Sequence, residues 1–143
     1  MTRDALRIGR HSVPGQIYLI TAATAGRRPV FLDFGCARRL IGHMRWLAGE
    51  AWVDSLAWVV MPDHVHWLVA LGERGDLSSL VRLLKGRTAR DVGGVVWQRA
   101  FHDRALRRDE DVVAAARYVV ANPLRAGLVA RLGDYPHWDA KWL

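Results

Sequence analysis

Two histidines separated by a single residue are the most informative chemical feature of the sequence. His64 and His66 lie within the apolar run 61–68. Alternate residues of a strand face the same side, so both imidazoles would project together while Val65 points to the other face. Two imidazoles on one face form a bidentate platform for a metal ion. The alternative is a pair of ordinary strand histidines that face solvent or pair with carboxylates, since buried polar groups need a partner.

A tyrosine and an asparagine form a second candidate pair near the C-terminal end. Tyr118 and Asn122 are four residues apart in a segment with helical character, so they share one face of that helix. A phenol and an amide oxygen are thus presented to the same place. Two structural alternatives stay open. Tyr118 could equally be a half-buried packing residue, and Asn122 before Pro123 also has the form of an N-cap that starts a new helical turn.

Other chemistry-bearing residues lack a comparable arrangement. The remaining histidines, His11, His43, His102 and His137, have no partner at a useful spacing. The single cysteine, Cys36, excludes an internal disulfide and a Cys-rich zinc site, and favours a reducing, cytoplasmic location. No P-loop, G-x-S-x-G elbow or Cys/His zinc spacing occurs in the sequence.

The charge of the chain indicates a polyanionic partner. The 143 residues carry a net charge of +7, and all but Lys85 and Lys141 of the 21 basic residues are arginines. Arginine forks match phosphate oxygens and stack on bases, although GC-rich coding would produce the same excess. A hydrophobic content of 51% and a charged content of 24% exclude a disordered or fibrous chain. We therefore expect one domain over residues 1–143, with nucleic acid or an acidic membrane surface as partner.

Apolar stretches in the sequence do not predict membrane insertion. The longest, residues 56–71, is interrupted by Pro62, Asp63 and the two histidines, whereas a spanning helix needs about 20 apolar residues. Residues 17–25 follow several arginines and loosely imitate a secretion signal. Their threonines and the preceding Pro14-Gly15 turn favour a strand instead. We expect no membrane partner.

The elements that must position these residues follow from periodicity and caps. The patterns predict strands over 16–24, 56–61, 64–71 and 95–101, and helices over 36–52, 77–92 and 112–122, with a further turn at 124–126. Asp76 and the acidic run 109–111 precede the second and third helices, and the aromatic tail 134–143 is expected to pack back on the domain. This order contains the βαββαβ pattern of a ferredoxin-like α+β sandwich with an antiparallel sheet.

Several segments, taken in order, resemble the single-tyrosine HUH transposases, specifically the REP-associated tyrosine transposases and their insertion-sequence relatives. The similarity extends over nearly the whole chain and implies the HUH endonuclease type of the ferredoxin-like fold. The segments that carry it are His11 with Tyr18-Leu-Ile-Thr21, Met61-Pro-Asp-His-Val-His66, Leu83-Leu-Lys85-Gly86, Val96-Trp-Gln-Arg-Ala-Phe-His102, and the block from Tyr118 to Gly127.

The resemblance implies a metal site and a nucleophile. His64 and His66 would hold a divalent cation, Mg²⁺ or Mn²⁺, with Asn122 as the third protein ligand. Tyr118 would attack the scissile phosphate in line and leave a 5′-phosphotyrosine and a free 3′-OH. Family members act on single-stranded DNA, often at hairpin-forming repeats. We expect a monomer, with a homodimer as the alternative.

Basic and aromatic residues supply candidate DNA contacts. Trp67 and Trp97 could stack on bases, although core positions explain them better. A solvated basic face is the competing explanation for the cationic residues. The candidate phosphate contacts are Arg27, Arg28, Arg82, Lys85, Arg87 and Arg90.

Three functions are consistent with these residues. The first is metal-dependent nicking and strand transfer of single-stranded DNA through Tyr118. The second is a catalytically inactive DNA-hairpin-binding protein on the same scaffold. The third is a hydrolytic metalloenzyme that uses His64 and His66 without Tyr118.

Overall fold

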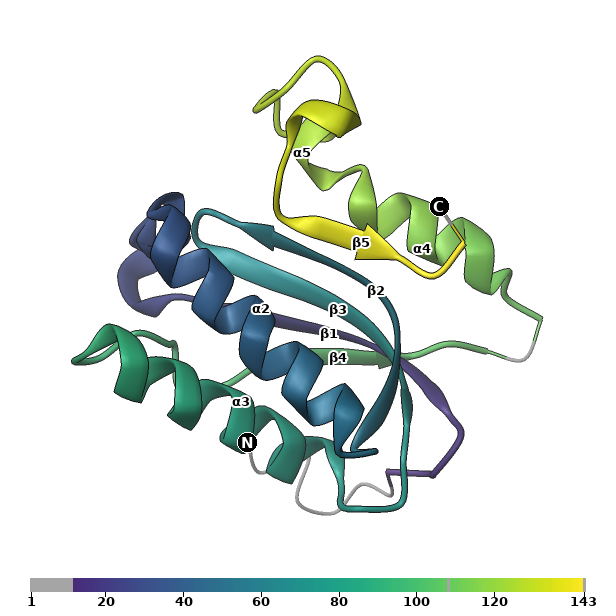
Figure 1. Cartoon of the computed structure of the whole chain (residues 1–143). Coiled ribbons are helices and arrows are strands. Elements are labelled where there is room, and N and C mark those ends of the chain that lie inside the picture. The colour runs from purple at the N-terminus through teal and green to yellow at the C-terminus, as the bar shows by residue number, and fades with distance from the viewer. Residues whose placement is uncertain (1–11, 108, 143) are drawn as a thin grey trace.

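The computed structural model describes residues 12–107 and 109–142, so His11 and Arg108 lie outside the described residues. Figure 1 shows the elements in chain order. The strands are β1 Ile17–Ala23, β2 Val53–Met61, β3 His64–Leu71, β4 His102–Ala105 and β5 Trp138–Ala140. The helices are α2 Phe34–Gly49, α3 Leu77–Val92, α4 Val112–Val120 and α5 Asn122–Arg125, with 3-10 turns η1 Ala25–Arg27, η2 Val30–Leu32 and η3 Leu132–Asp134.

The five strands form one sheet in the order β4-β1-β3-β2-β5, in which every neighbouring pair is antiparallel. The first four strands have the order of a ferredoxin-like sandwich, so the predicted fold class is confirmed. β5 extends the sheet beyond β2, where Ala57–Val59 pair with Trp138–Ala140. β3 is consequently the central strand and has a neighbour along both of its edges.

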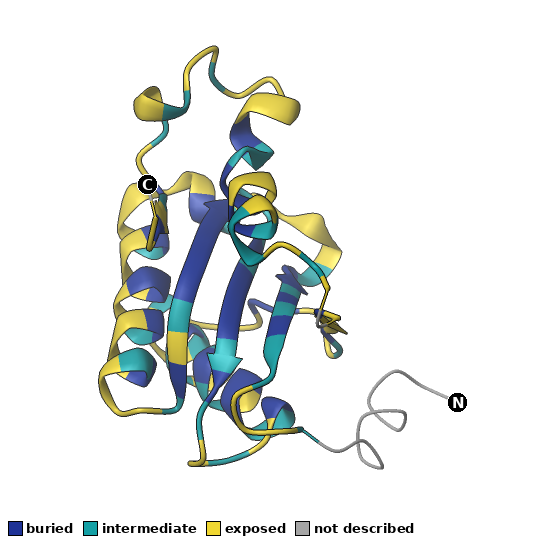
Figure 2. Ribbon diagram, turned by 90° about the vertical axis from the view of Figure 1, so that its right-hand side faces the viewer, coloured by how far each residue is buried: buried dark blue, intermediate teal, exposed yellow. Residues whose placement is uncertain are grey.

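Helices cover both faces of the sheet (Figure 1). α2 and α3 lie on one face, where Leu40, Leu47 and Leu80 pack with Val65 and Trp67 of β3 in the larger core. α4 lies on the opposite face, in smaller clusters of its own. The three central strands β1, β3 and β2 are largely buried, and the helices expose their outer sides (Figure 2). No helix in the described part of the chain is long and apolar enough to span a bilayer.

Aspartates set the starts of the three long helices. The side chain of Asp33 accepts a hydrogen bond from the Cys36 backbone, and Asp76 accepts one from Ser79. Asp111 does the same at α4. Each carboxylate satisfies backbone N–H groups that have no partner within the helix. α3 ends at Gly93, whose φ of 92° suits glycine. The helix starts predicted at 77 and 112 are therefore confirmed.

The segment after α3 differs from the predicted strand over 95–101. It contributes only an isolated bridge between Trp97 and Thr24, and the fourth strand begins at His102. The Lys85 amine on α3 donates to the carbonyls of Gln98 and Ala100 at 2.8 and 3.0 Å. These oxygens are thus satisfied by a side chain instead of a strand ladder.

The elements predicted for the C-terminal part are confirmed in outline, but their boundaries differ. α4 ends at Val120, two residues earlier than predicted, and Pro123 stands in the first turn of α5. Proline there needs no N–H partner, so the chain starts a new helix instead of extending the first. The aromatic tail does pack back on the sheet, but the sequence patterns did not predict that it forms β5.

Gly72 at the end of β3 provides a test of the packing beside the central strand. A Cβ atom there would collide with the backbone oxygen of Ala51 and lie 2.9 Å from that of Trp52. We expect Gly72→Ala to lower the free energy of unfolding by about 2 kcal/mol, because backbone atoms must shift. Gly42→Ala in α2, with open space around it, should raise the free energy of unfolding by about 0.5–1 kcal/mol. Urea unfolding measures both; equal stability of the two variants would contradict this packing.

Candidate metal and nucleophile site

The register of the sheet places both histidines on the face covered by α4. His66 pairs with Thr21 of β1 and Val59 of β2, while His64 pairs with Ala23 and Met61. The two half-buried rings are edge to face, with centroids 4.8 Å apart. The prediction that they share one face of a strand is therefore confirmed.

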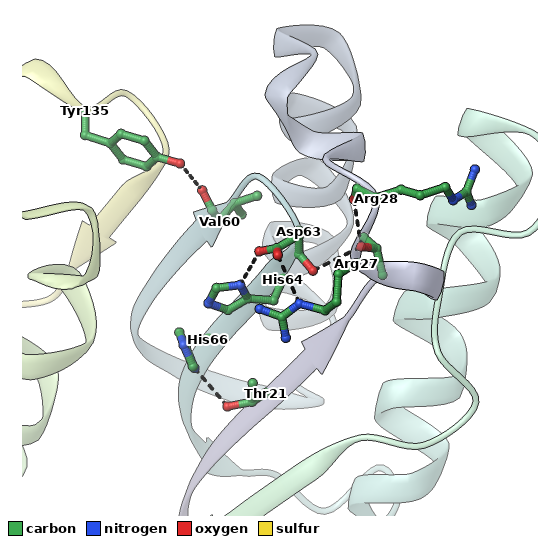
Figure 3. A network of polar contacts seen from close by, with 9 residues as sticks. Thr21, Arg27, Arg28, Val60, Asp63, His64, His66 and Tyr135 are labelled. Carbon is green, nitrogen blue, oxygen red and sulfur yellow. Dashed lines mark hydrogen bonds and ion pairs between the residues drawn. The ribbon is translucent and has the colours of Figure 1, made fainter. Parts of the chain in front are cut away.

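Each histidine ring is fixed through its Nδ1 atom (Figure 3). His64 Nδ1 lies 2.7 Å from Asp63 Oδ1, and His66 Nδ1 shares a 2.8 Å hydrogen bond with Thr21 Oγ1. Among the described residues no hydrogen bond engages either Nε2. A metal-binding histidine is typically held this way, since a bond at one ring nitrogen orients the other for the metal.

The electrostatics at His66 favour neutral imidazole. Burial lowers the pKa of His66 to about 4, and the nearby charges of His64, Arg125 and Arg27 act in the same direction. His66 is therefore uncharged at neutral pH, which is the form that ligates metals. Burial opposes ionisation of Asp63, but hydrogen bonds from His64 and Arg27 outweigh it and lower the pKa of this carboxyl.

Tyr118 lies on the outer side of α4. The helix buries Ala116, Val119 and Val120 toward the sheet, whereas Tyr118 is 64% exposed. The guanidinium of Arg125 lies 3.8 Å from the centre of its ring, a cation–π contact between α5 and α4. Tyr118 is thus accessible to a large substrate such as DNA.

The other two tyrosines use their hydroxyl groups within the fold. Tyr18 Oη accepts a hydrogen bond from the Val13 backbone, and Tyr135 Oη donates to the Val60 carbonyl at 2.5 Å. Of the three tyrosines, Tyr118 is the one suited to attack an external group.

Asn122 is half-buried at the junction between α4 and α5. Its Nδ2 donates to the Val119 carbonyl at 2.7 Å, and no hydrogen bond among the described residues engages its Oδ1. Tyr118 belongs to α4 and Asn122 to α5, so the single continuous helix predicted to carry both is wrong. Among the described residues, no hydrogen bond or ring contact joins Tyr118 or Asn122 to the histidines. Arg125, which stacks on Tyr118, is one of the charges that lower the pKa of His66.

The donor atoms fit a divalent cation of the hard or borderline type. Within residues 12–107 and 109–142 no group of three or more histidine, cysteine or carboxylate side chains could hold a metal. Two Nε2 atoms therefore need oxygen donors of another kind, such as the Asn122 amide, a phosphate or water. A mixed nitrogen and oxygen set with open positions suits Mn²⁺ or Mg²⁺.

The candidate phosphate contacts divide between two places. Arg27 and Arg28 belong to the β1–α2 connection, and Arg27 Nε donates to Oδ2 of Asp63, the residue before His64, at 2.9 Å. Arg28 instead donates to the carbonyls of Ala25 and Val95. Arg27 is half-exposed, so part of its guanidinium can reach a ligand.

The other four candidates belong to α3, on the opposite face from the histidines. Lys85 is engaged by the carbonyls of the following loop, and Arg87 lies 4.0 Å over the Trp46 ring. Arg82 and Arg90 are exposed. DNA contact by these residues stays a prediction. The two tryptophans proposed as stacking groups are buried core residues, Trp67 at 1% and Trp97 at 9% exposed.

The sequence analysis did not predict the contacts that three residues make at the site. Thr21 holds His66, Asp63 holds His64, and Arg125 covers Tyr118. Asp63 adjoins His64 in the chain, which was an available signal. The other two contacts depend on strand register and on the break between α4 and α5.

The comparisons with known proteins agree with this fold. Residues 12–102 match the family described as IS200-like transposases, which is more than half of the chain. The protein belongs to the IS200-like transposase family.

Individual relatives are REP-associated tyrosine transposases. That of Escherichia coli K12 is 34% identical over 82 residues, or 56% of this chain and 50% of the relative. A provisionally named one of Haemophilus influenzae is 26% identical over 100 residues, 59% of this chain and 57% of its own length. The chain thus spans about half the length of these curated relatives.

A solved structure of a REP-associated tyrosine transposase bound to a REP hairpin is similar over 90% of this chain and 79% of that one, with a TM-score of 0.78 and 27% identity. This similarity extends from β1 into the C-terminal part, and it supports the fold as described.

Titration of His66 predicts the pH dependence of stability. Its folded pKa of about 4 lies below the ordinary value of 6.5, so the unfolded chain binds a proton first as the pH falls. The stabilisation is complete above pH 6.5 and is lost between pH 6.5 and 4. We expect wild type to lose about 2 kcal/mol from this residue between pH 7 and pH 5. Denaturant unfolding of wild type and His66→Gln measures this; an equal pH dependence in both proteins would contradict it.

Proposed function

We propose that this protein is a metal-dependent enzyme that nicks and rejoins single-stranded DNA at hairpin-forming repeats. The observation that carries the proposal is the pair of oriented histidines on the face of the sheet that α4, the helix of Tyr118, covers. Family membership supports a transposase of this kind. The exposed phenol supplies a nucleophile that DNA can reach.

In the proposed reaction the Tyr118 oxygen attacks phosphorus and the bond to the 3′-oxygen breaks. The phenol proton passes to a base or to water, and the departing 3′-oxygen takes up a proton. The product is a 5′-phosphotyrosine diester, and attack by a 3′-OH reverses the step without a nucleotide cofactor. A cation bound by His64, His66 and Asn122 would supply charge stabilisation at the phosphate.

A DNA hairpin is the proposed partner for two reasons. A structural neighbour, 27% identical, is described as bound to a REP hairpin. The basic side chains at both ends of the sheet sandwich add attraction for a phosphate backbone, which carries most of the affinity for nucleic acid and weakens with salt. Arg82 and Arg90 on α3 are exposed and can serve this role, whereas Lys85 is engaged in the fold.

A second function is favoured by one specific observation. The ring of Tyr118 is covered by the guanidinium of Arg125. A catalytically inactive hairpin-binding protein would tolerate a tyrosine covered in this way, whereas catalysis requires that the phosphate reach the Tyr118 hydroxyl.

A covalent adduct assay separates these two functions. We expect wild type, with Mn²⁺ and a 5′-extended DNA hairpin, to form a denaturant-stable protein–DNA adduct. Tyr118→Phe should abolish the adduct because it removes the attacking oxygen, and chelation of the metal with EDTA should do the same. Tyr135→Phe is the matched control and should retain the adduct. Hairpin binding without an adduct from wild type would instead establish the binding protein.

A mixing experiment tests whether one chain holds a complete site. We expect His66→Ala and Tyr118→Phe to remain inactive when combined, because each chain of a monomer uses its own residues. The same adduct assay reports the result, with wild type diluted into each variant as the control. Adduct formation by the mixture would show that Tyr118 acts on the histidines of a second copy.

A further inference from the structure

We propose that Asp63, held by Arg27, is the positioning residue that orients His64 toward a divalent cation. The inference rests on the proposed function, which assigns His64 and His66 to a metal site. It adds a chain of three side chains, Arg27–Asp63–His64, in which each member fixes the next. The two connecting hydrogen bonds are 2.9 and 2.7 Å long.

Hydrogen bonds to backbone carbonyls fix the position of Asp63. The Thr24 amide and the Thr24 hydroxyl both donate to the Asp63 carbonyl, at 2.9 and 3.1 Å. The Phe31 amide donates to the neighbouring Pro62 carbonyl at 2.9 Å. The β1–α2 connection is therefore attached to the β2–β3 turn on both sides of Arg27. Thr24 is fully buried, so these bonds are shielded from water.

The carboxylate of Asp63 uses one oxygen for each neighbour. Oδ1 accepts from His64 and Oδ2 accepts from Arg27. Rotation of the carboxylate would break at least one of these charge-assisted bonds. Arg27 itself has a φ of 54°, a left-handed conformation uncommon for residues other than glycine. This turn brings its guanidinium back over the strand ends (Figure 3).

The two histidines differ in how strongly their tautomer is fixed. A carboxylate can only accept a hydrogen bond, so Asp63 requires the proton of neutral His64 on Nδ1 and leaves the lone pair on Nε2. The Thr21 hydroxyl can donate or accept, so it orients the His66 ring without choosing its tautomer. Asp63 thus prepares one metal ligand before any cation binds.

Arg28 offers a matched control within the same turn. It is exposed and cationic like Arg27, but it donates to backbone carbonyls and not to Asp63. Loss of either arginine removes one positive charge from the β1–α2 connection. Only the loss of Arg27 releases the Asp63 carboxylate.

Binding of Mn²⁺ alone tests the proposal without DNA or catalysis. Electron paramagnetic resonance of free Mn²⁺ gives the affinity of the full chain. We expect affinity to fall 10- to 100-fold in Asp63→Asn, the usual effect of removing a residue that orients a ligand. It should fall about 3- to 10-fold in Arg27→Met, because Asp63 remains but is no longer fixed. Arg28→Met should stay within twofold of wild type.

A spectroscopic measurement on the metal-free protein separates orientation from general loss of structure. Two-bond ¹H–¹⁵N correlation spectra report which ring nitrogen carries the proton. We expect His64 to be protonated on Nδ1 in wild type and to become a mixture of tautomers in Asp63→Asn, while the His66 signals stay in place. Thermal unfolding confirms that each variant is folded. Arg27→Met removes the hydrogen bond from Arg27 to Asp63 without altering the β2–β3 turn.

Wild-type Mn²⁺ affinity in Asp63→Asn, with the His64 proton kept on Nδ1, would overturn the inference. If wild type nevertheless forms the Tyr118 adduct, the proposed function stands although the inference about Asp63 fails. If Asp63→Asn weakens Mn²⁺ binding while wild type forms no adduct, the inference stands and the proposed function fails. A wild type that binds no Mn²⁺ refutes both the inference and the metal part of the function.

Discussion

The two-residue period of β3 is the constraint on which the rest of this structure depends. β3 is the middle strand of five, so its side chains meet packed layers on both faces. Val65 and Trp67 fill the larger core under α2 and α3, and this fixes His64 and His66 on the other face. A shift of one residue in register would exchange the two sets and bury the imidazoles under α2. The hydrophobic core therefore determines the placement of the polar pair.

Much of the fold was predictable because local signals agreed with the final packing. Asp76 and Asp111 cap the helices that their positions predicted, and β3 occupies the predicted residues. Two features depended on partners distant in the sequence. Residues 95–101 are rich in strand-forming types, but Lys85 binds the carbonyls of Gln98 and Ala100. β5 forms because the edge of β2 is available for pairing. Neither partner is visible in local composition.

The candidate site was predictable to the extent that it depends on strand and helix periods. The spacing of His64 and His66 predicted their shared face, whereas the one helix predicted for Tyr118 and Asn122 is divided into α4 and α5. Thr21 reaches His66 through the pairing of β1 with β3, across 45 positions of the sequence. Arg125 reaches the ring of Tyr118 because the helix is interrupted between them. Contacts of this kind require tertiary structure, which spacing alone does not supply.

The unequal size of the two packed layers has a consequence for local opening. α2 and α3 share one extensive core with the sheet, whereas α4 is held by smaller clusters that include Ala116 and Val119. Regions with fewer buried apolar contacts open at a lower free energy than the global transition. We therefore expect α4, which carries Tyr118, to open at a lower free energy than α2 and α3. In a hydrogen-exchange experiment, the amides of α4 would exchange faster than those of α2 and α3 on the other face of the sheet.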